Sequence, residues 1–243
     1  MKDLLVPSSL DPMGHAICDF LRDGRCDRLR LFSSDFEEDE FPVSDLFRTF
    51  EQMPLLERVA LERARGRILD VGAGSGCHSL ALQGMGKDVM AIDISALSIE
   101  AVRAQGVLKA ELVNFYDPSL LGGYDTILML MNGTGFIGKI EGIGRFFDRL
   151  SDLLALGGEV LIDSSDLRYL YEDEDGSFEV DLMGEYYGEI DFQMQYRDVV
   201  GERFDWLYLD FDSLSFYAEQ FGFRAELIES GCHYDYLASL TLA

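Results

Sequence analysis

A strand-like run that passes through three alternating glycines into a helix-like segment limits the fold of this chain more than any other feature. The run is Ile68-Leu69-Asp70-Val71-Gly72-Ala73-Gly74-Ser75-Gly76-Cys77-His78-Ser79. Glycine permits a tight turn and lets a ligand approach the backbone closely. A helix N-terminus adds free N–H groups and a positive dipole. In doubly wound sheets such a turn lies at the carboxyl edge, so the sequence predicts a ligand site there.

Residues 67–165 read as a parallel sheet with crossover helices, because short apolar runs alternate with helical patterns. The predicted strands are 67–71, 89–92, 110–113, 126–131 and 159–162. The clearest helix precedes the last of these strands and is expected to end at Gly157-Gly158. Its apolar positions keep helical spacing: Ile143, Phe146, Phe147, Leu150, Leu153 and Leu154.

The flanking segments have a different character. Residues 1–66 read as a helical N-terminal extension, with one helix from Asp11-Pro12 to Gly24 and another from Pro54 to Gly66. Residues 36–42 are expected to form an acidic surface loop. Within the segment 166–211, the runs 189–196 and 202–210 alternate apolar and polar positions, which predicts an antiparallel hairpin with its turn at Gly201. Residues 212–243 predict a last helix, capped by Asp212 or Ser213, and two final strands.

An acidic residue stands at the expected distance behind the glycine run. Asp93 closes the second predicted strand seventeen positions after Gly76, where it can accept hydrogen bonds from both hydroxyls of a ribose. A dinucleotide-binding turn follows G-x-G-x-x-G, whereas here Cys77 stands at the last position and the third glycine comes one residue early. The spacing therefore disfavours NAD.

This pattern resembles motif I of the class I S-adenosylmethionine-dependent methyltransferases. Asp93-Ile94 looks like their ribose-binding position, and Asn114-Phe115 stands where that family places an Asp beside the adenine. Residues 124–128 and 156–161 look like the family's fourth and fifth strands. The resemblance implies a doubly wound, Rossmann-like α/β fold of seven mostly parallel strands with one antiparallel strand. The N-terminal extension and the hairpin would lie over the carboxyl edge of this single domain and close a substrate pocket.

The resemblance also implies roles for individual residues. Asp70 would approach the amino group of the cofactor, and the methionine portion would lie along the glycine loop. Asp93 would hold the ribose, while Ile94 and Phe115 would contact the adenine. The residues assigned to S-adenosylmethionine are Asp70, Gly72, Ala73, Gly74, Gly76, Asp93, Ile94, Asn114, Phe115 and Met131. Met131 and Asn132 would face the sulfonium. The protein mainly has to align the methyl with its acceptor, because the sulfonium is already activated.

Candidates for acceptor binding and catalysis are less sharply defined. Phe47 and Arg48 would offer an apolar wall with one planar cation, although Arg48 could instead pair with Asp45 or Glu51. Asp163 ends the fifth strand and could bind the acceptor or cap the next segment. We assign Asn132 and His233 as catalytic candidates, because His is the usual base near neutral pH. Cys77 and His78 read as packing and hydrogen-bonding residues.

The amino-acid composition restricts the classes of partner that this protein can bind. Twenty Lys and Arg against forty-five Asp and Glu give a net charge of −25, which argues against nucleic acid and anionic membranes as partners. No signal peptide and no long apolar run are apparent, so we expect a cytoplasmic protein with four free thiols. No metal site is expected, since the run Glu172-Asp173-Glu174-Asp175 reads as a solvated turn more readily than as a cation site.

Together these features predict a methyltransferase that moves a methyl group by direct displacement to a small-molecule acceptor. Two other functions remain open at this point. One is a non-catalytic S-adenosylmethionine-binding protein, and the other is an NAD-dependent oxidoreductase.

Overall fold

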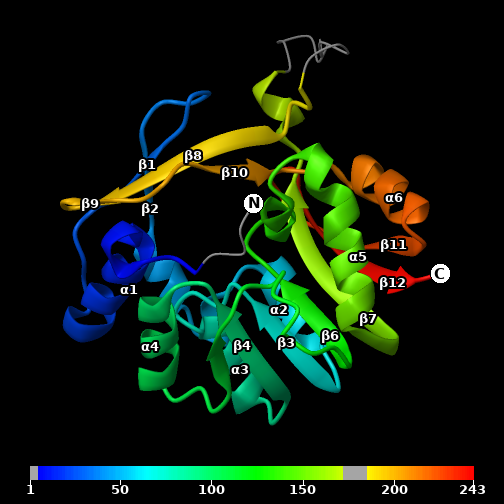
Figure 1. Ribbon diagram of the computed structural model, residues 1–243, viewed down its shortest axis with the longest axis horizontal. Coiled ribbons are helices and arrows are strands. Elements are labelled where there is room, and N and C mark those ends of the chain that lie inside the picture. Colours follow the sequence, from blue (N-terminus) through cyan, green and yellow to red (C-terminus); the bar gives the residue numbers. More distant parts are fainter. Residues whose placement is uncertain (1–4, 172–184) are drawn as a thin grey trace.

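The computed structural model describes residues 5–171 and 185–243, so the acidic run at 172–175 lies outside the described residues. A seven-stranded sheet in the order β11-β12-β7-β6-β3-β4-β5 forms the centre of the fold (Figure 1). All neighbouring strands are parallel except β12, which runs antiparallel to both β7 and β11. This confirms the predicted fold class. The strands are β3 (Arg67–Val71), β4 (Asp88–Asp93), β5 (Ala110–Leu112), β6 (Tyr124–Met129), β7 (Leu154–Ser165), β11 (Phe223–Ser230) and β12 (Asp235–Leu242).

Helices cover both faces of this sheet. On one face lie α2 (Leu55–Arg63), α3 (Cys77–Gly84) and α4 (Ala96–Ala104); on the other lie α5 (Ile143–Leu153) and α6 (Phe211–Gln220). Successive strand residues point to opposite faces, so Ile68 packs with α2 and α3 whereas Leu69 packs with α5 and α6. The core strands are apolar on both faces because both are buried.

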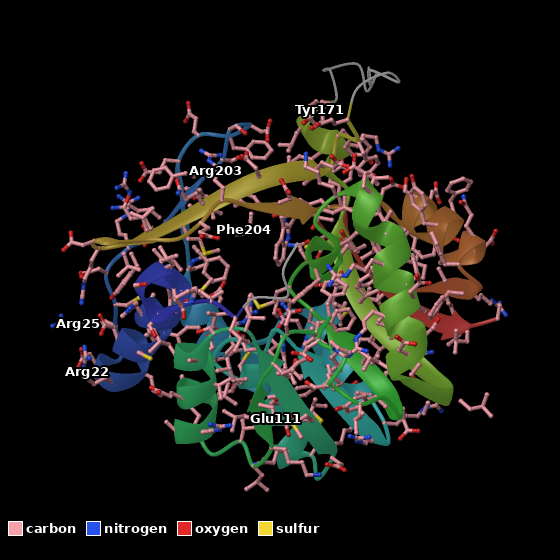
Figure 2. All side chains as sticks on the ribbon, in the orientation of Figure 1. Arg22, Arg25, Glu111, Tyr171, Arg203 and Phe204 are labelled. Carbon is pink, nitrogen blue, oxygen red and sulfur yellow. The ribbon has the colours of Figure 1, made fainter. Side chains whose placement is uncertain are left out.

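A second sheet, which we name the cap sheet, combines segments from both flanks of the core. Its order is β10-β8-β1-β2, and β9 pairs with β8 as well. Its strands are β1 (Leu29–Phe32), β2 (Asp39–Phe41), β8 (Glu189–Tyr196), β9 (Val199–Val200) and β10 (Phe204–Leu207). Helix α1 (Pro12–Asp23) packs between this sheet and α4, where Ile17, Leu29 and Ala101 are buried together. Figure 2 shows Phe204 on the side of the cap sheet that faces the central sheet.

Short 3₁₀ helices connect these elements. They are η1 (Ser8–Leu10), η2 (Val43–Phe47), η3 (Phe50–Gln52), η4 (Gly133–Ile137), η5 (Ile140–Gly142) and η6 (Leu167–Leu170). Helix η4 follows β6 at the carboxyl edge of the central sheet and contacts β10 of the cap sheet.

Several predicted boundaries are wrong in informative ways. The supposed loop 36–42 contains β2, and β1 precedes it, so the N-terminal extension is not wholly helical. These strands were missed because β1 pairs with β8, a partner about 160 residues away. The tight turn of the hairpin is at Arg197 and Asp198, since Tyr196 pairs with Val199, and Gly201 lies beyond it.

Some helix boundaries also differ from their predicted positions. The clearest helix ends at Leu153, and Gly157-Gly158 lie within β7. Helix α2 ends at Arg63 because Lys87 Nζ donates to the carbonyls of Leu61, Glu62 and Ala64 and thereby caps it. The cap of α6 is Asp210, whose carboxylate accepts from Ser213 N at 2.9 Å. Helix α1 matches its prediction, with Asp11 as N-cap and Gly24 as C-cap.

Candidate functional site

The glycine loop between β3 and α3 has the backbone that its sequence predicts. Gly72, Gly74 and Gly76 have φ angles of +71°, +57° and +93°, a region that L side chains rarely adopt. A side chain at Gly72 would overlap the ring of Phe136, which comes from η4. At Gly74 a Cβ would meet only Leu46 Cδ2, at 3.7 Å. Gly74 is therefore required by its backbone conformation rather than by crowding.

Asp93 lies beside this loop at the end of β4. Its carboxylate accepts hydrogen bonds from Gly74 N at 2.9 Å and from Ser95 N at 2.8 Å. Burial raises the pKa of Asp93 to about 6, although these N–H groups oppose the shift. A carboxylate has about four acceptor positions, so two hydroxyl donors can still be accommodated. The neighbouring Ile94 is 38% exposed and offers an apolar surface beside the carboxylate.

The segment after β5 carries the other residues that the resemblance places near the adenine of the cofactor. Asn114 Oδ1 accepts from Tyr116 N at 2.8 Å, which closes a local turn. The Phe115 ring is buried in the main core, with its centroid 6.1 Å from that of Phe146. Both residues thus lie at the carboxyl edge near β4, with the Phe115 side chain directed into the core.

A buried polar network lies beneath the glycine loop. Asp70 accepts from Ser79 Oγ at 2.6 Å, and burial raises the pKa of Asp70. His78 Nε2 lies 2.9 Å from one oxygen of Glu57, and Arg48 Nη2 donates to the other at 2.6 Å. Burial disfavours a charged imidazole, but the Glu57 carboxylate outweighs it and raises the pKa of His78.

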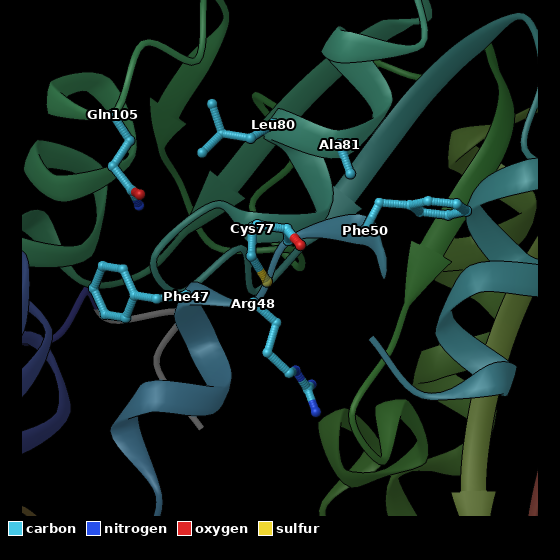
Figure 3. A pocket seen from close by; sticks show the side chains of 8 residues that line it. Phe47, Arg48, Phe50, Cys77, Leu80, Ala81 and Gln105 are labelled. Atoms are coloured by element: carbon cyan, nitrogen blue, oxygen red, sulfur yellow. The ribbon is translucent and has the colours of Figure 1, made fainter. Parts of the chain in front are cut away.

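Arg48 has a more specific partner than expected. It pairs with Glu57 and lies 4.0 Å from Asp45, while its Nε is buried with no hydrogen-bond partner among the described residues. The Phe47 ring stacks on Phe20 with centroids 4.6 Å apart. A hollow of about 310 Å³ lies beside α3, and its lining includes Phe47, Arg48 and Leu80. Figure 3 shows that the Arg48 guanidinium points away from Leu80. Phe47 and Arg48 thus both line this hollow, and Arg48 also joins the buried network through Glu57.

The end of β6 has the most unusual backbone in the site. The predicted strand continues to Met131, but β6 ends at Met129 because Met131 and Asn132 have φ angles of +67° and +63°. Asp163 accepts from Met131 N at 3.1 Å and from Gly133 N at 2.9 Å. Asn132 Oδ1 accepts from Ser165 Oγ at 2.8 Å. The structure therefore brings three sequence candidates, Met131, Asn132 and Asp163, together.

His233 lies apart from this group. It is exposed in the turn between β11 and β12, where its backbone N–H donates to Asp235 Oδ1 at 2.9 Å. Asp235 pairs with Ser165, so this turn borders the carboxyl end of β7. Its catalytic role stays a prediction.

Comparison with solved structures decides the family. A SAM-dependent methyltransferase from Bacteroides fragilis, crystallised with S-adenosyl-L-homocysteine, is 59% identical and has a TM-score of 0.93. The alignment covers 98% of each chain. This protein is an S-adenosylmethionine-dependent methyltransferase. The alternatives of a non-catalytic binding protein and of an NAD-dependent oxidoreductase are thereby set aside.

More distant structures share the fold of this methyltransferase. The methyltransferase CcbJ from Streptomyces caelestis is 15% identical, with a TM-score of 0.60 over 96% of this chain and 98% of its own. The sugar N-methyltransferase KedS8 from a Streptoalloteichus species is 16% identical, with a TM-score of 0.54 over 82% and 88%. No protein-family model and no curated protein matches the chain.

The residues of the methyltransferase fit its cofactor, S-adenosylmethionine. The open space above Gly74 can receive an extended chain, and the partly buried Asp93 carboxylate adjoins the loop through its hydrogen bond with Gly74 N. Ile94 supplies an exposed apolar contact. When bound, the cofactor supplies an activated methyl group, so the protein needs no covalent nucleophile. Cys77 agrees with this, because burial raises the pKa of its thiol to about 12.

Three residues of the site escaped the sequence-based interpretation. Glu57 lies on the buried face of α2. Its position three and four residues before the apolar Ala60 and Leu61 was the sequence signal that a charged side chain is buried there. Phe136 and Trp206 lie with ring centroids 5.8 Å apart, and a Cβ at Gly135 would overlap Trp206. Trp206 and Phe204 lie two positions apart and share one face of the hairpin, but tertiary packing decides which part of the protein that face contacts.

Proposed function

We propose that this methyltransferase transfers the methyl group by direct displacement to a small-molecule acceptor held between the cap sheet and the carboxyl edge. The observation that carries this proposal is the contact of β10 with η4, where the Trp206 ring fills the space over Gly135. A cap packed this closely on the loop after β6 favours a compact acceptor. The fold neighbour KedS8 is a sugar N-methyltransferase, which agrees with an acceptor of this class.

In this proposal the cofactor runs along the glycine loop. Asp70 and Gly72 to Gly74 hold its methionine portion, and Asp93 accepts from the ribose hydroxyls. Ile94, Asn114 and the backbone of Phe115 border the adenine, while the Phe115 ring packs in the core. Gly76 provides the close packing of α3 on α4, since a Cβ at this position would lie 3.2 Å from Val102. These roles follow from the family resemblance and from the space and donors described above.

The acceptor would meet the methyl group beside Met131 and Asn132. Asn132 and His233 are the proposed groups that orient the acceptor, and Phe47 and Arg48 are the proposed contacts to it. Arg48 is the natural receiver of an acidic group in a chain with a net charge of −25, and its buried Nε lacks a partner among the described residues.

The same charge argues that the acceptor is not nucleic acid and that the protein does not bind anionic membranes. Among the described residues no helix combines the length and apolarity needed to cross a bilayer. We propose a cytoplasmic enzyme, in agreement with its free cysteines.

A labelled-methyl screen tests the acceptor class. The protein is incubated with S-adenosylmethionine carrying a deuterated methyl group and with separate small-molecule, nucleic-acid and protein fractions of a cell extract. Mass spectrometry should find the labelled methyl in a small molecule, and Asp93→Ala should reduce its formation. Label that enters only nucleic acid or protein would contradict the proposal.

A further inference from the structure

Three consecutive residues at the end of β7 hold the loop that follows β6. Strands β6 and β7 are parallel neighbours, so their carboxyl ends lie side by side (Figure 1). Asp163 accepts from the backbone of Met131 and Gly133, and Ser165 donates to the side chain of Asn132. Each residue from 131 to 133 is therefore tied to β7.

This tie has a conformational reason. Met131 and Asn132 are both in the left-handed region, which costs free energy for residues with a Cβ. Such backbone persists only where its surroundings determine it strongly. A single carboxylate that accepts the N–H groups on both sides of Asn132 fixes the turn in this form. We name the segment 131–133 the methyl-side turn.

Ser164 extends the connection to the cap sheet. Its Oγ lies 2.6 Å from Thr134 Oγ1, and it accepts from Leu209 N at 2.9 Å. Thr134 Oγ1 also donates to the carbonyl of Leu207, at 2.8 Å. Asp163, Ser164 and Ser165 of β7 thus hold both the methyl-side turn and the chain at the end of β10.

The surroundings of Asp163 show that this carboxylate is not an incidental surface group. Burial raises its pKa to about 6, and the two backbone donors oppose that shift. Glu57 raises the pKa further, whereas His78 lowers it. Both oxygens are already occupied by backbone donors that lie on the loop expected beside the sulfonium.

We propose that Asp163 is a positioning residue for methyl transfer, which sets the backbone of the methyl-side turn rather than contacting the acceptor. This inference rests on the proposed function, because it takes Met131 and Asn132 as the residues that face the reacting methyl. Small displacements of such groups reduce rates strongly, since alignment is the main contribution of the protein.

The test compares Asp163→Asn with Asp166→Asn, a matched change at the end of the same strand. The carboxamide keeps the size of Asp163 but has one acceptor oxygen, so it can serve only one of the two N–H groups. Asp166 instead accepts from Tyr187 and Arg168, away from the turn. Calorimetry would measure the Kd of S-adenosylmethionine and of S-adenosylhomocysteine, which lacks the methyl and the sulfonium charge.

Asp163→Asn should weaken S-adenosylmethionine about tenfold and S-adenosylhomocysteine less than threefold, while Asp166→Asn changes neither. In the wild type the amide signals of Met131 and Gly133 should shift with pH near 6 in NMR spectra, and in Asp163→Asn this shift should vanish. Equal weakening of both ligands by Asp163→Asn, or amide signals that do not titrate in the wild type, would overturn the inference.

A second variant serves if Asp163→Asn does not fold. Ser165→Ala releases only the Asn132 side chain and should weaken S-adenosylmethionine by about threefold without affecting S-adenosylhomocysteine. A Ser165→Ala protein whose ratio of affinities for the two ligands equals that of the wild type would then overturn the inference. Wild-type protein that binds neither ligand would overturn the proposed function as well, which separates the two failures.

Discussion

The backbone N–H of Gly74 donates to the carboxylate of Asp93 at 2.9 Å and joins the glycine loop to the end of β4. Two segments 19 residues apart in the chain are thereby held in one geometry. The loop can present its backbone to a ligand chain while the carboxylate faces the ligand's hydroxyls.

Gly74→Val should abolish binding of S-adenosylhomocysteine, because the new side chain would enter the space where the cofactor approaches the backbone. Its positive φ also costs about 1–2 kcal/mol for a residue with a Cβ. Gly106→Val is the matched control, since Gly106 has a φ of +98° and no atom within 4 Å of its Cβ position. Thermal shifts should show ligand stabilisation in the control and none in Gly74→Val. Equal stabilisation in both would contradict the assigned loop.

Cofactor affinity should depend on pH through Asp93. The ribose hydroxyls donate to the ionised carboxylate, so binding lowers its pKa from the value of about 6 in the free protein. Affinity should therefore rise with pH and level off above about 7, with a roughly tenfold loss at pH 5. Asp93→Asn should remove most of this dependence, and Asp93→Ala should weaken binding by about 1.5–3 kcal/mol. A pH profile that is the same in wild type and Asp93→Asn would exclude Asp93 as its source.

The same carboxyl affects stability with the opposite sign. Its folded pKa is raised above 3.8, so the folded protein binds more protons than the unfolded chain between about pH 4 and 6. The contribution of Asp93 to the free energy of unfolding must then fall as pH rises through this range. Urea unfolding at several pH values should show that Asp93→Asn gains stability relative to the wild type toward pH 7. A constant difference between the two proteins would count against the raised pKa.

Arg48→Ala should destabilise the fold, because it leaves the buried Glu57 with His78 alone. Breaking a buried ion pair costs about 3–5 kcal/mol, and we expect the lower end because His78 remains. Arg28→Ala is the control, since its ion pair with Glu40 is exposed on both sides and should contribute little to stability. Denaturant unfolding measures both values. If Arg48 also binds the acceptor, Arg48→Lys should raise the acceptor KM while cofactor affinity stays nearly constant.

Cys77→Ser should retain methyl transfer, because the thiol is buried and its pKa is raised to about 12. A thiol-specific reagent at pH 8 should modify the exposed Cys232 first and leave Cys77 protected. Complete loss of turnover in a folded, cofactor-binding Cys77→Ser protein would mean that the reaction uses a covalent step.

How far the sequence predicted this structure can be judged from particular residues. Local signals located β3, the glycine loop, α1 and Asp93, because their chemistry depends on neighbours in the chain. The cap sheet escaped prediction because Leu29 pairs with Tyr196, and nothing local specifies that partner. The left-handed turn at Met131 and Asn132 depends on Asp163, and the role of Arg48 on Glu57; both are tertiary relationships.

A crystal structure of this protein with S-adenosylhomocysteine would show directly where the cofactor binds. It should place both ribose hydroxyls within hydrogen-bonding distance of the Asp93 carboxylate, the homocysteine along Gly72 to Gly74, and the sulfur beside the methyl-side turn. A ligand bound elsewhere, or a ribose turned away from Asp93, would contradict the assigned cofactor site.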